Sequence, residues 1–498
     1  MARPPQPAPA AAAAAGARGS LLVPVLLAVV AVLGLQVSQH ADWLQLQLIA
    51  PKLPDHWVRP ATLGEQPQCQ QLFAVAADAR ARDGQQRTEF CEDVELLHGS
   101  PGWALLSCDP GRGEWNTVMG PLKDPASRGG LWTTKLGSQT QPKLLPLHGF
   151  PENATFHPLG TAYVPASGAH PGRLFVVNHA EESSAIEVFD MSLVDEEWRA
   201  AHVRSLRSPV ATHSPNGLAA LGRNELLVSQ DHMFVLRPPP LEQFVALLAP
   251  RLGPLAEPLA WLLSSPARHI LPRLETVLGL PLGWVSHVSF VEEPTVEPQA
   301  SVVASRIPFA NGISLTPRGS MLAVASTMTP AVKLFRPAGT AAGKPDWSQP
   351  LQLAGEIHVP HGCDNIAFSA PEPDQPADSL FDGARLLITG HPSGLRLIRF
   401  ARNPRGAEPA GSWIVDALPK SAGAQLAPDT APLPAQDRAL KANEAVTVRT
   451  LYQSQRGQAP GTPSSAGSDW AREDNASEGT LIMGGLYGGV SVCHGVGL

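Results

Sequence analysis

The most constraining feature of this sequence is a unit that recurs along most of its length. Each unit has a short alternating apolar run, a turn and a second apolar run, and four of the units begin with a carboxylate or amide side chain. Such a pair of runs predicts a β-hairpin. The polar residues in this position are Glu92, Asp93, Asn216, Asn311, Asp364 and Asn365. Acidic and amide oxygens at the stiff start of a strand are ligands that suit Ca²⁺.

Six hairpins are predicted, and their starts lie roughly 55–95 residues apart, a spacing that is typical of one propeller blade per repeat. The paired runs are Val94–Leu97 with Trp103–Leu106, Thr161–Val164 with Leu174–Val177, Leu218–Leu221 with Glu225–Val228, Ile313–Leu315 with Met321–Val324, Ile366–Phe368 with Leu386–Thr389, and Val446–Leu451 with Thr480–Met483. We therefore predict an all-β fold, a six-bladed β-propeller over residues 69–498. An ordinary β-sandwich with a chance pattern of asparagines is the alternative.

The composition is consistent with a large single ring of blades. The chain has 498 residues, and its 51 prolines and 44 glycines suit many turns between short strands. Its formal charge is −7 and no basic stripe runs along it, which excludes nucleic acid as an expected partner. The Ala-, Pro-, Gly- and Ser-rich segments 418–445 and 455–478 are predicted to be loops.

The amino terminus predicts entry into the secretory pathway. Residues 1–18 form a tail whose only charges are Arg3 and Arg18, and residues 19–41 carry no charge. The apolar run in 19–41 is long enough to cross a bilayer, so we expect either a retained signal anchor or a cleaved signal peptide. Arginines before the span favour a lumenal or extracellular propeller, anchored or secreted. Residues 42–68 are predicted to be a linker.

Five cysteines fit an oxidising compartment. A propeller closes by pairing its terminal strands, so Cys69 near the start and Cys493 in the last strand are predicted to form a disulfide. Cys91 and Cys108 flank the first hairpin and either face each other or remain reduced, and Cys363 is left free. The sequons at Asn153 and Asn475 are predicted glycosylation sites.

Several ordered motifs carry a resemblance to a known family. They are Phe156-His-Pro-Leu-Gly160, Leu174–Ala180, Ser214-Pro-Asn-Gly217, Ser229–Phe234, Phe309–Pro317, Gly390–Gly394 and the final Val492-Cys493. Together they cover most of residues 69–493, and the chain resembles the serum paraoxonase/arylesterase family. The resemblance implies a six-bladed propeller with Ca²⁺ in its central tunnel.

The resemblance also implies a set of site residues. The ligands of the family's catalytic calcium correspond to Glu92, Asn216, Asn311, Asp364 and Asn365, all of which keep an oxygen-bearing side chain. A second calcium is doubtful, because Asp93 is retained as a ligand whereas Gly217 replaces a family aspartate.

The family's pair of catalytic histidines is only half retained. His179 matches one member and is the expected base or orienting residue, while Leu159 occupies the position of the other. Whether His157 replaces the missing member stays open. His232 and His391 match family positions at the tunnel mouth and, as single histidines, favour structural roles.

Residues 236–284 depart most from the family and are predicted to be a helical insertion between blades three and four. Prolines divide it into short helices that either lie on a membrane surface or pack on the propeller rim. The leading functional hypothesis is a calcium-dependent arylesterase or lactonase acting on small apolar lactones or esters. The alternative is a membrane-anchored, calcium-stabilised propeller that binds a partner without esterase activity.

Overall fold

The computed structural model describes residues 30–31, 34–35 and most of 51–498. Within 51–498 the description leaves out 63, 79–80, 82, 137–140, 238–242, 244, 246–252, 254–268, 340–344, 372–379, 405, 407, 421–444, 456–462 and 471–478. The predicted tail, most of the predicted membrane segment and residues 42–50 of the predicted linker therefore lie outside the described residues. No helix in the described part of the chain is long and apolar enough to cross a membrane.

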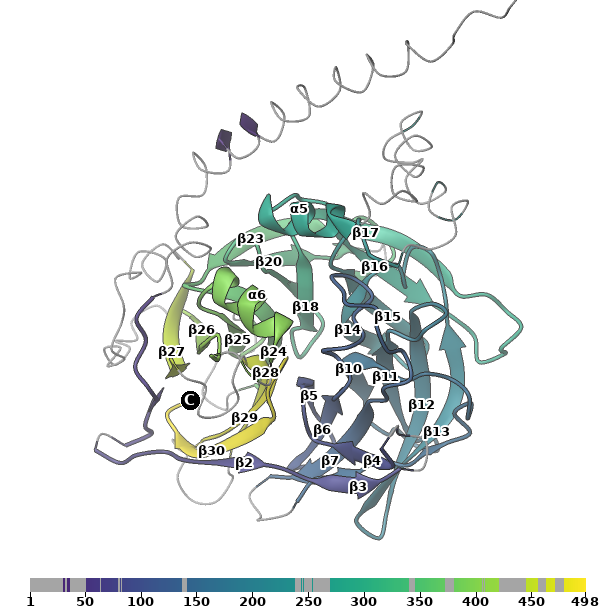
Figure 1. Ribbon diagram of the computed structural model, residues 1–498, viewed down its shortest axis with the longest axis horizontal. Coiled ribbons are helices and arrows are strands. Elements are labelled where there is room, and N and C mark those ends of the chain that lie inside the picture. The colour runs from purple at the N-terminus through teal and green to yellow at the C-terminus, as the bar shows by residue number, and fades with distance from the viewer. Residues whose placement is uncertain are drawn as a thin grey trace, which may run out of the picture.

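The described strands form a six-bladed β-propeller (Figure 1). Blade one contains β5 (Cys91–Leu96), β6 (Trp103–Cys108), β7 (Gly130–Lys135) and β8 (Lys143–Leu144). Blade two contains β10 (Pro158–Val164), β11 (Gly172–Asn178), β12 (Ala185–Val194) and β13 (Glu197–Leu206), with β9 (Leu147–His148) added parallel to β13. Blade three contains β14 (Pro215–Gly222), β15 (Glu225–Gln230), β16 (Gly283–Ser289) and β17 (Gln299–Ile307).

Three further blades complete the ring. Blade four contains β18 (Ala310–Leu315), β19 (Leu322–Ser326), β20 (Ala331–Arg336) and β23 (Gln352–His358). Blade five contains β24 (Gly362–Phe368), β25 (Leu386–His391), β26 (Ser412–Pro419), β27 (Val446–Ser454) and β1 (Trp57–Val58). Blade six contains β28 (Pro463–Trp470), β29 (Gly479–Gly485), β30 (Val490–Val496) and β2 (Gln68–Leu72). Two small ribbons lie outside the blades, β3 (Val75–Ala77) with β4 (Gln85–Arg87) and β21 (Ala338–Gly339) with β22 (Pro345–Asp346).

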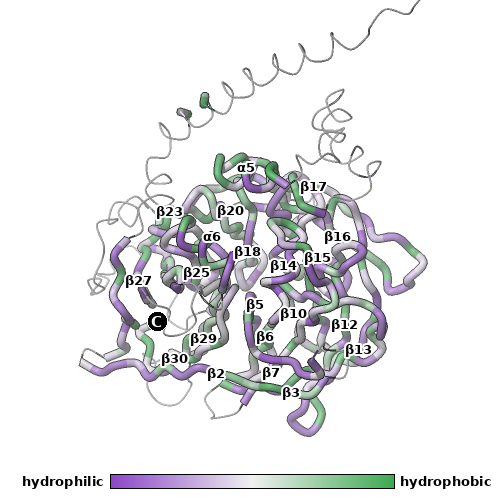
Figure 2. Tube along the Cα trace, viewed as in Figure 1, coloured by the Kyte–Doolittle hydropathy of each residue, from purple (hydrophilic) through white to green (hydrophobic). Residues whose placement is uncertain are grey.

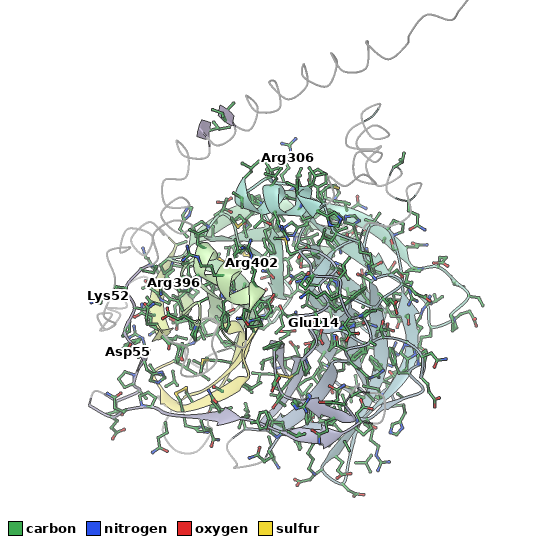
Figure 3. The ribbon with its side chains drawn as sticks, in the orientation of Figure 1. Lys52, Asp55, Glu114, Arg306, Arg396 and Arg402 are labelled. Carbon is green, nitrogen blue, oxygen red and sulfur yellow. A yellow bond between two sulfur atoms is a disulfide. The ribbon has the colours of Figure 1, made fainter. Side chains whose placement is uncertain are left out.

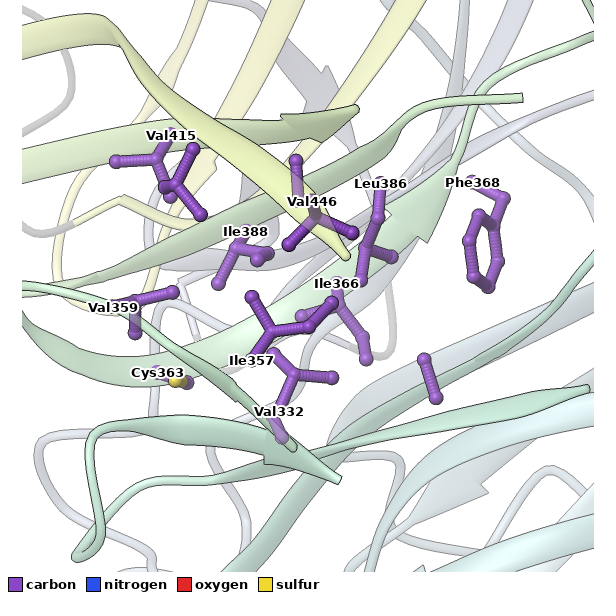
Figure 4. Packing of buried hydrophobic residues seen from close by; sticks show 14 of the residues in the cluster. Val332, Ile357, Val359, Cys363, Ile366, Phe368, Leu386, Ile388, Val415 and Val446 are labelled. Carbon is purple, nitrogen blue, oxygen red and sulfur yellow. The ribbon is translucent and has the colours of Figure 1, made fainter. Parts of the chain in front are cut away.

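The hydrophobic core lies between the blades. The first strand of each blade contacts the first strand of the next, in the closed order β5, β10, β14, β18, β24, β28 and back to β5. Buried apolar side chains fill each of the six spaces between neighbouring blades. Figure 4 shows the space between blades four and five, where Val332 and Ile357 meet Ile366 and Ile388. Hydrophobic residues are accordingly spread around the whole ring (Figure 2).

The sixth predicted hairpin is wrong. Val446–Leu451 lies in β27, the fourth strand of blade five, whereas Thr480–Met483 lies in β29, the second strand of blade six. The first strand of blade six is β28, within the segment 455–478 that was predicted to be a loop. Its sequence, Pro-Ser-Ser-Ala-Gly-Ser-Asp-Trp, has no apolar alternation and therefore does not predict a strand. The strand forms because the segment pairs with β29.

The ring closes through the amino-terminal strand, as predicted. β2 pairs antiparallel with β30, and Cys69 lies opposite Cys493 and is bonded to it (Figure 1). Cys91 and Cys108 also form a disulfide, and Cys363 is free and buried. Part of the predicted linker is a strand, because β1 pairs with β27 of blade five.

The predicted insertion lies within blade three, not between blades three and four. It separates β15 from β16, the second and third strands of that blade. Two α-helices with defined bounds occur in the described chain, α5 (Leu271–Val277) in this insertion and α6 (Gly394–Arg402) between β25 and β26. Both lie in front of the sheets in Figure 1.

Candidate functional site

The predicted site residues lie on one face of the propeller, because of how antiparallel strands are connected. Each first strand starts on the face where the connection from the second to the third strand also lies. These connections include residues 109–129 in blade one, the insertion that contains α5 in blade three, and residues 392–411 with α6 in blade five. They lie on the same face as the starts of β5, β14, β18 and β24, where the predicted ligands are found.

Side chains of blades five and one meet directly across the axis. The Nδ2 of Asn365 donates to Oε1 of Glu92 at 2.9 Å and to the backbone oxygen of Glu92 at 3.3 Å. Asp93, the next residue of β5, accepts hydrogen bonds from the backbone nitrogen of Thr161 at 2.6 Å and from its hydroxyl at 2.7 Å. The ends of β24, β5 and β10 are therefore joined around the axis by polar contacts.

Three glycines bring the remaining first strands to the same level. A Cβ on Gly160 would lie 2.1 Å from the backbone oxygen of Asn216. A Cβ on Gly217 would lie 2.9 Å from the Cα of Gly312, and one on Gly312 would lie 2.5 Å from the Cα of Asn365. Because glycine has no side chain, β10, β14, β18 and β24 approach one another backbone to backbone.

Asp364 is held from two sides. The Nδ2 of Asn311 donates to its Oδ1 at 2.7 Å, and Nε2 of His391 donates to its Oδ2 at 2.8 Å. All five predicted ligands are buried, with exposed fractions of 2% for Glu92, 8% for Asn216, 4% for Asn311, 4% for Asp364 and 6% for Asn365. The structure therefore gathers residues that are far apart in the sequence around one axis.

The chemistry of this set fits Ca²⁺. The Oδ1 atoms of Asn216 and Asn311 are buried and have no hydrogen-bond partner among the described residues. Burial raises the pKa of Glu92 well above its usual range, Asp93 and Asp364 add to the effect, and Arg112 opposes it. A dication would satisfy the amide oxygens and offset the two carboxylates. Within the described chain no three His, Cys, Asp or Glu side chains form a metal-binding group, so the set depends on its amides.

The residues expected for a second metal do not fit one. The Oδ2 of Asp93 is used by Thr161, and its Oδ1 accepts from the backbone nitrogen of Val94 at 2.9 Å. At position 217 a side chain would meet the backbone of Gly312 and Ile313 at 2.9 Å. Hydrogen bonds and close strand packing therefore occupy this part of the tunnel.

His179 is buried and has both ring nitrogens engaged. Its Nε2 donates to the backbone oxygen of Pro215 at 3.0 Å, and its Nδ1 accepts from the hydroxyl of Thr117 at 2.5 Å. Burial lowers the pKa of His179 to about 4, with Asp231 opposing the shift. The imidazole is therefore neutral near pH 7 and fixes the residue that precedes Asn216.

His157 does not present a free ring nitrogen that could replace the histidine missing at position 159, because both of its ring nitrogens have partners. Its Nδ1 lies 3.1 Å from Oδ2 of Asp109, and its Nε2 donates to the backbone oxygen of Pro125 at 3.0 Å. Leu159 packs against the apolar cluster between blades two and three. His232 contacts the hydroxyl of Thr276 in α5 through Nε2 at 2.7 Å. It links β15 to the insertion, which agrees with a structural role.

The connection between β6 and β7 contributes residues that the sequence motifs did not identify. The indole Nε1 of Trp115 donates to the backbone oxygen of His179 at 2.8 Å, and Thr117 bonds the ring of the same histidine. Arg112 is 6% exposed and donates through Nη2 to the backbone oxygen of Pro158 at 3.2 Å. No local pattern marks these residues, because their position depends on how residues 109–129 lie across blade two.

A cavity of about 810 Å³ lies on the opposite side of this ring of contacts. Asp93, Gly217, Gly312 and Asn365 are among the residues that line it, together with the later residues of the first strands. Glu95 also lines it, and burial together with Asp93 raises the pKa of this carboxyl to about 8. Asn153 is exposed, and Asn475 lies outside the described residues.

Comparison with known proteins leaves the function open. No protein-family model matches the chain, and no curated protein matches its sequence. Among solved structures it is similar to a luciferin-regenerating enzyme (10% identity, 86% of this chain and 95% of that chain covered, TM-score 0.38). It is also similar to regucalcin, a calcium-binding protein of Agrobacterium tumefaciens (9%, 89% and 94%, TM-score 0.36). A third is a putative 6-phosphogluconolactonase of Bacteroides fragilis (10%, 76% and 75%, TM-score 0.33). Likeness at this level carries no argument about activity.

Proposed function

We propose that this protein is a calcium-dependent hydrolase of lactones or aryl esters. Two contacts carry the proposal, that of Asn365 with Glu92 and that of Asn311 with Asp364. Asn216 is buried in β14, whose backbone packs between those of β10 and β18, and its Oδ1 has no hydrogen-bond partner among the described residues. We further propose membership of the serum paraoxonase/arylesterase family, because the ordered motifs contain Asn216 and Asn311, and Glu92, Asp364 and Asn365 correspond to the family's remaining ligand positions.

The five side chains would hold one Ca²⁺. Bound there, the ion supplies Lewis-acid polarisation of an ester or lactone carbonyl. The chain itself keeps the ligands in place: Asn311 and His391 hold the two oxygens of Asp364, and Asn365 holds Glu92. Ligands that are fixed before binding lose little freedom when the ion or substrate arrives.

His179 acts in this proposal by orientation. Its Nε2–H holds the carbonyl of Pro215, and thereby the start of β14 where Asn216 lies. With a pKa of about 4 and Nδ1 already bonded to Thr117, the imidazole does not need to change protonation near neutral pH. Trp115 and Thr117 in turn hold His179 in place.

A second function is favoured by two specific observations. Leu159 stands at the position of the family's second histidine, and the proposed ligands are at most 8% exposed. A propeller whose Ca²⁺ is structural and whose rim binds a protein partner accounts for both.

We also propose a compartment, and the disulfides support it. Two disulfides in one propeller favour folding in the secretory pathway, with the blades in the lumen or outside the cell. Attachment to a membrane surface and glycosylation at Asn153 and Asn475 are part of the same proposal.

The proposal is tested with purified protein on a panel of lactones and phenyl acetate. We expect hydrolysis with Ca²⁺, none after chelation, and recovery when Ca²⁺ is returned. Asp364→Ala is expected to lose both activity and calcium binding, the latter measured by competition with a calcium-sensitive dye. Tight calcium binding by the parent protein without turnover of any substrate would favour the binding propeller instead.

A further inference from the structure

Arg112 lies at the proposed site, and its guanidinium makes no ion pair with a described residue. Arg112 is 6% exposed, and the one hydrogen bond of its side chain within the described chain goes from Nη2 to the backbone oxygen of Pro158. Its Nε is buried and has no hydrogen-bond partner. No described carboxylate lies within ion-pair distance of the guanidinium group. A buried guanidinium is ordinarily paired, because transfer of a charge out of water is costly.

The carboxylates nearest in sequence are used elsewhere or point outward. Asp109 accepts from the backbone nitrogen of Gly111 at 3.0 Å through Oδ1, and its Oδ2 lies 3.1 Å from the ring of His157. Glu114 is exposed, and Figure 3 labels it near the centre of the ring. Arg112 therefore makes no ion pair with a described carboxylate, although it lies in the connection between β6 and β7 beside the proposed site.

The segment that carries Arg112 is held firmly over the site. Trp115 and Thr117 bond His179, and Asp109 meets His157, so both sides of Arg112 are fixed to blade two. Burial raises the pKa of Glu92 and of Tyr487 and lowers that of His179; the charge of Arg112 opposes the first two shifts and adds to the third. Through its bond to Pro158 and the bonds of Trp115 and Thr117 to His179, the guanidinium lies beside the start of β10, next to the proposed site.

We propose that Arg112 is a substrate-binding residue of this site and that the substrates are lactones or esters that also carry a carboxylate. The inference rests on the proposed function and adds the substrate class to it. The unused Nε–H provides a charge-assisted donor, which is the chemistry that recognises a carboxylate. Pro158, which holds the other side of the guanidinium, directly precedes Leu159. The guanidinium of Arg112 is therefore held beside Leu159, the position where the family that the chain resembles has a histidine.

The test measures binding and hydrolysis separately. Calorimetry with Ca²⁺ present compares hexanoate with hexanamide, which has the same length and no charge. We expect the parent protein to bind hexanoate, Arg112→Gln to bind it about 30-fold more weakly, and Arg112→Lys to fall between them. Hexanamide should bind equally to all three. Arg402→Gln, which removes an exposed charge from α6, is the matched control and should bind hexanoate like the parent.

The hydrolysis measurement uses a δ-lactone with a pendant carboxylate and the methyl ester of that carboxylate. Arg112→Gln should lower kcat/KM about 30-fold for the acid and leave the methyl ester within about threefold. Equal losses for both substrates, or unchanged hexanoate binding in Arg112→Gln, would overturn the assignment. Thermal melting of each variant checks that a loss is not a failure to fold.

The outcomes separate this inference from the proposed function. If hexanoate binding depends on Arg112 but no lactone or ester is turned over, the anion site stands and the hydrolase proposal fails. If the methyl ester is hydrolysed in a calcium-dependent way while hexanoate does not bind, the hydrolase proposal stands and the role of Arg112 is refuted.

Discussion

The Nδ2 of Asn365 donates a 2.9 Å hydrogen bond to Oε1 of Glu92, although the two residues are 273 positions apart in the chain. Asn365 belongs to β24 of blade five and Glu92 to β5 of blade one, so this contact passes the first strand of blade six. An amide that donates from nitrogen leaves its oxygen available. The pair therefore stabilises the ring before any cation is present.

Replacing this amide by a carboxylate should make the protein depend on calcium for stability. In Asn365→Asp the hydrogen bond is lost and two buried carboxylates face each other, which costs about 2–3 kcal/mol without a cation. With Ca²⁺ bound, the added charge is offset. We expect the difference between the melting temperatures in calcium and in chelator to be larger in Asn365→Asp than in the parent.

Asn403→Asp, at the exposed end of α6, serves as the control and should leave that difference unchanged. An equal drop for Asn365→Asp in both conditions would contradict a cation at this position.

A single calcium ion per chain is expected. Asp93 is saturated by Thr161 and Val94, and position 217 has no room for a ligand. Metal analysis after dialysis should give a stoichiometry of one calcium ion per chain.

Gly217→Ala should destabilise the fold by about 1–3 kcal/mol because the added methyl group meets backbone atoms. Chemical denaturation would measure this loss. Gly222→Ala in the same strand meets nothing within 4 Å and is the control. Two bound ions, or a neutral Gly217→Ala, would refute this interpretation.

The ring-closing disulfide should stabilise more than the local one. Cys69 and Cys493 are separated by 424 positions, whereas Cys91 and Cys108 are separated by 17. In the chain-entropy model a loop of about 400 residues is worth about 6 kcal/mol and one of about 17 residues about 3 kcal/mol. Urea unfolding of the two Cys→Ser double variants should therefore show the larger loss for Cys69 with Cys493. The reverse order would show that unfolded-chain entropy does not govern these bonds.

Stability should fall as the pH is lowered from about 6.5 towards 4. Burial lowers the pKa of His179 to about 4 and that of His361 to about 3, whereas histidine in the unfolded chain titrates near 6.5. Between these values the unfolded state binds more protons, so each histidine costs about 1.4 kcal/mol per pH unit as the pH falls. Urea unfolding at several pH values measures the slope.

His361→Phe isolates one of these contributions, because His361 is fully buried and is not one of the proposed ligands. In this variant the slope of the unfolding free energy against pH should be smaller by up to about 1.4 kcal/mol per pH unit, which corresponds to the uptake of one proton. Identical slopes in the parent and in His361→Phe would show that His361 does not remain neutral in the folded state.

Much of the architecture was predictable because it depends on the short-range pattern of apolar and polar residues. Five of the six hairpins follow from alternating apolar runs, and β24 and β25 lie where Ile366–Phe368 and Leu386–Thr389 were expected. The disulfide of Cys69 with Cys493 followed from the need to close a ring, which is a property of the fold and not of the local sequence. β28 was missed because Ser, Gly and Asp dominate it, and only its partner β29 makes it a strand.

The sequence by itself determined which oxygen-bearing side chains begin the strands, since that depends only on residue type beside an apolar run. The tertiary structure decided what surrounds them. Gly217 packs against the backbone of Gly312, Thr117 and Pro215 bond the two ring nitrogens of His179, and Arg112 bonds the backbone of Pro158. These relationships join residues from different blades. They depend on the curvature and packing of the closed ring, and local pattern contains no information about either.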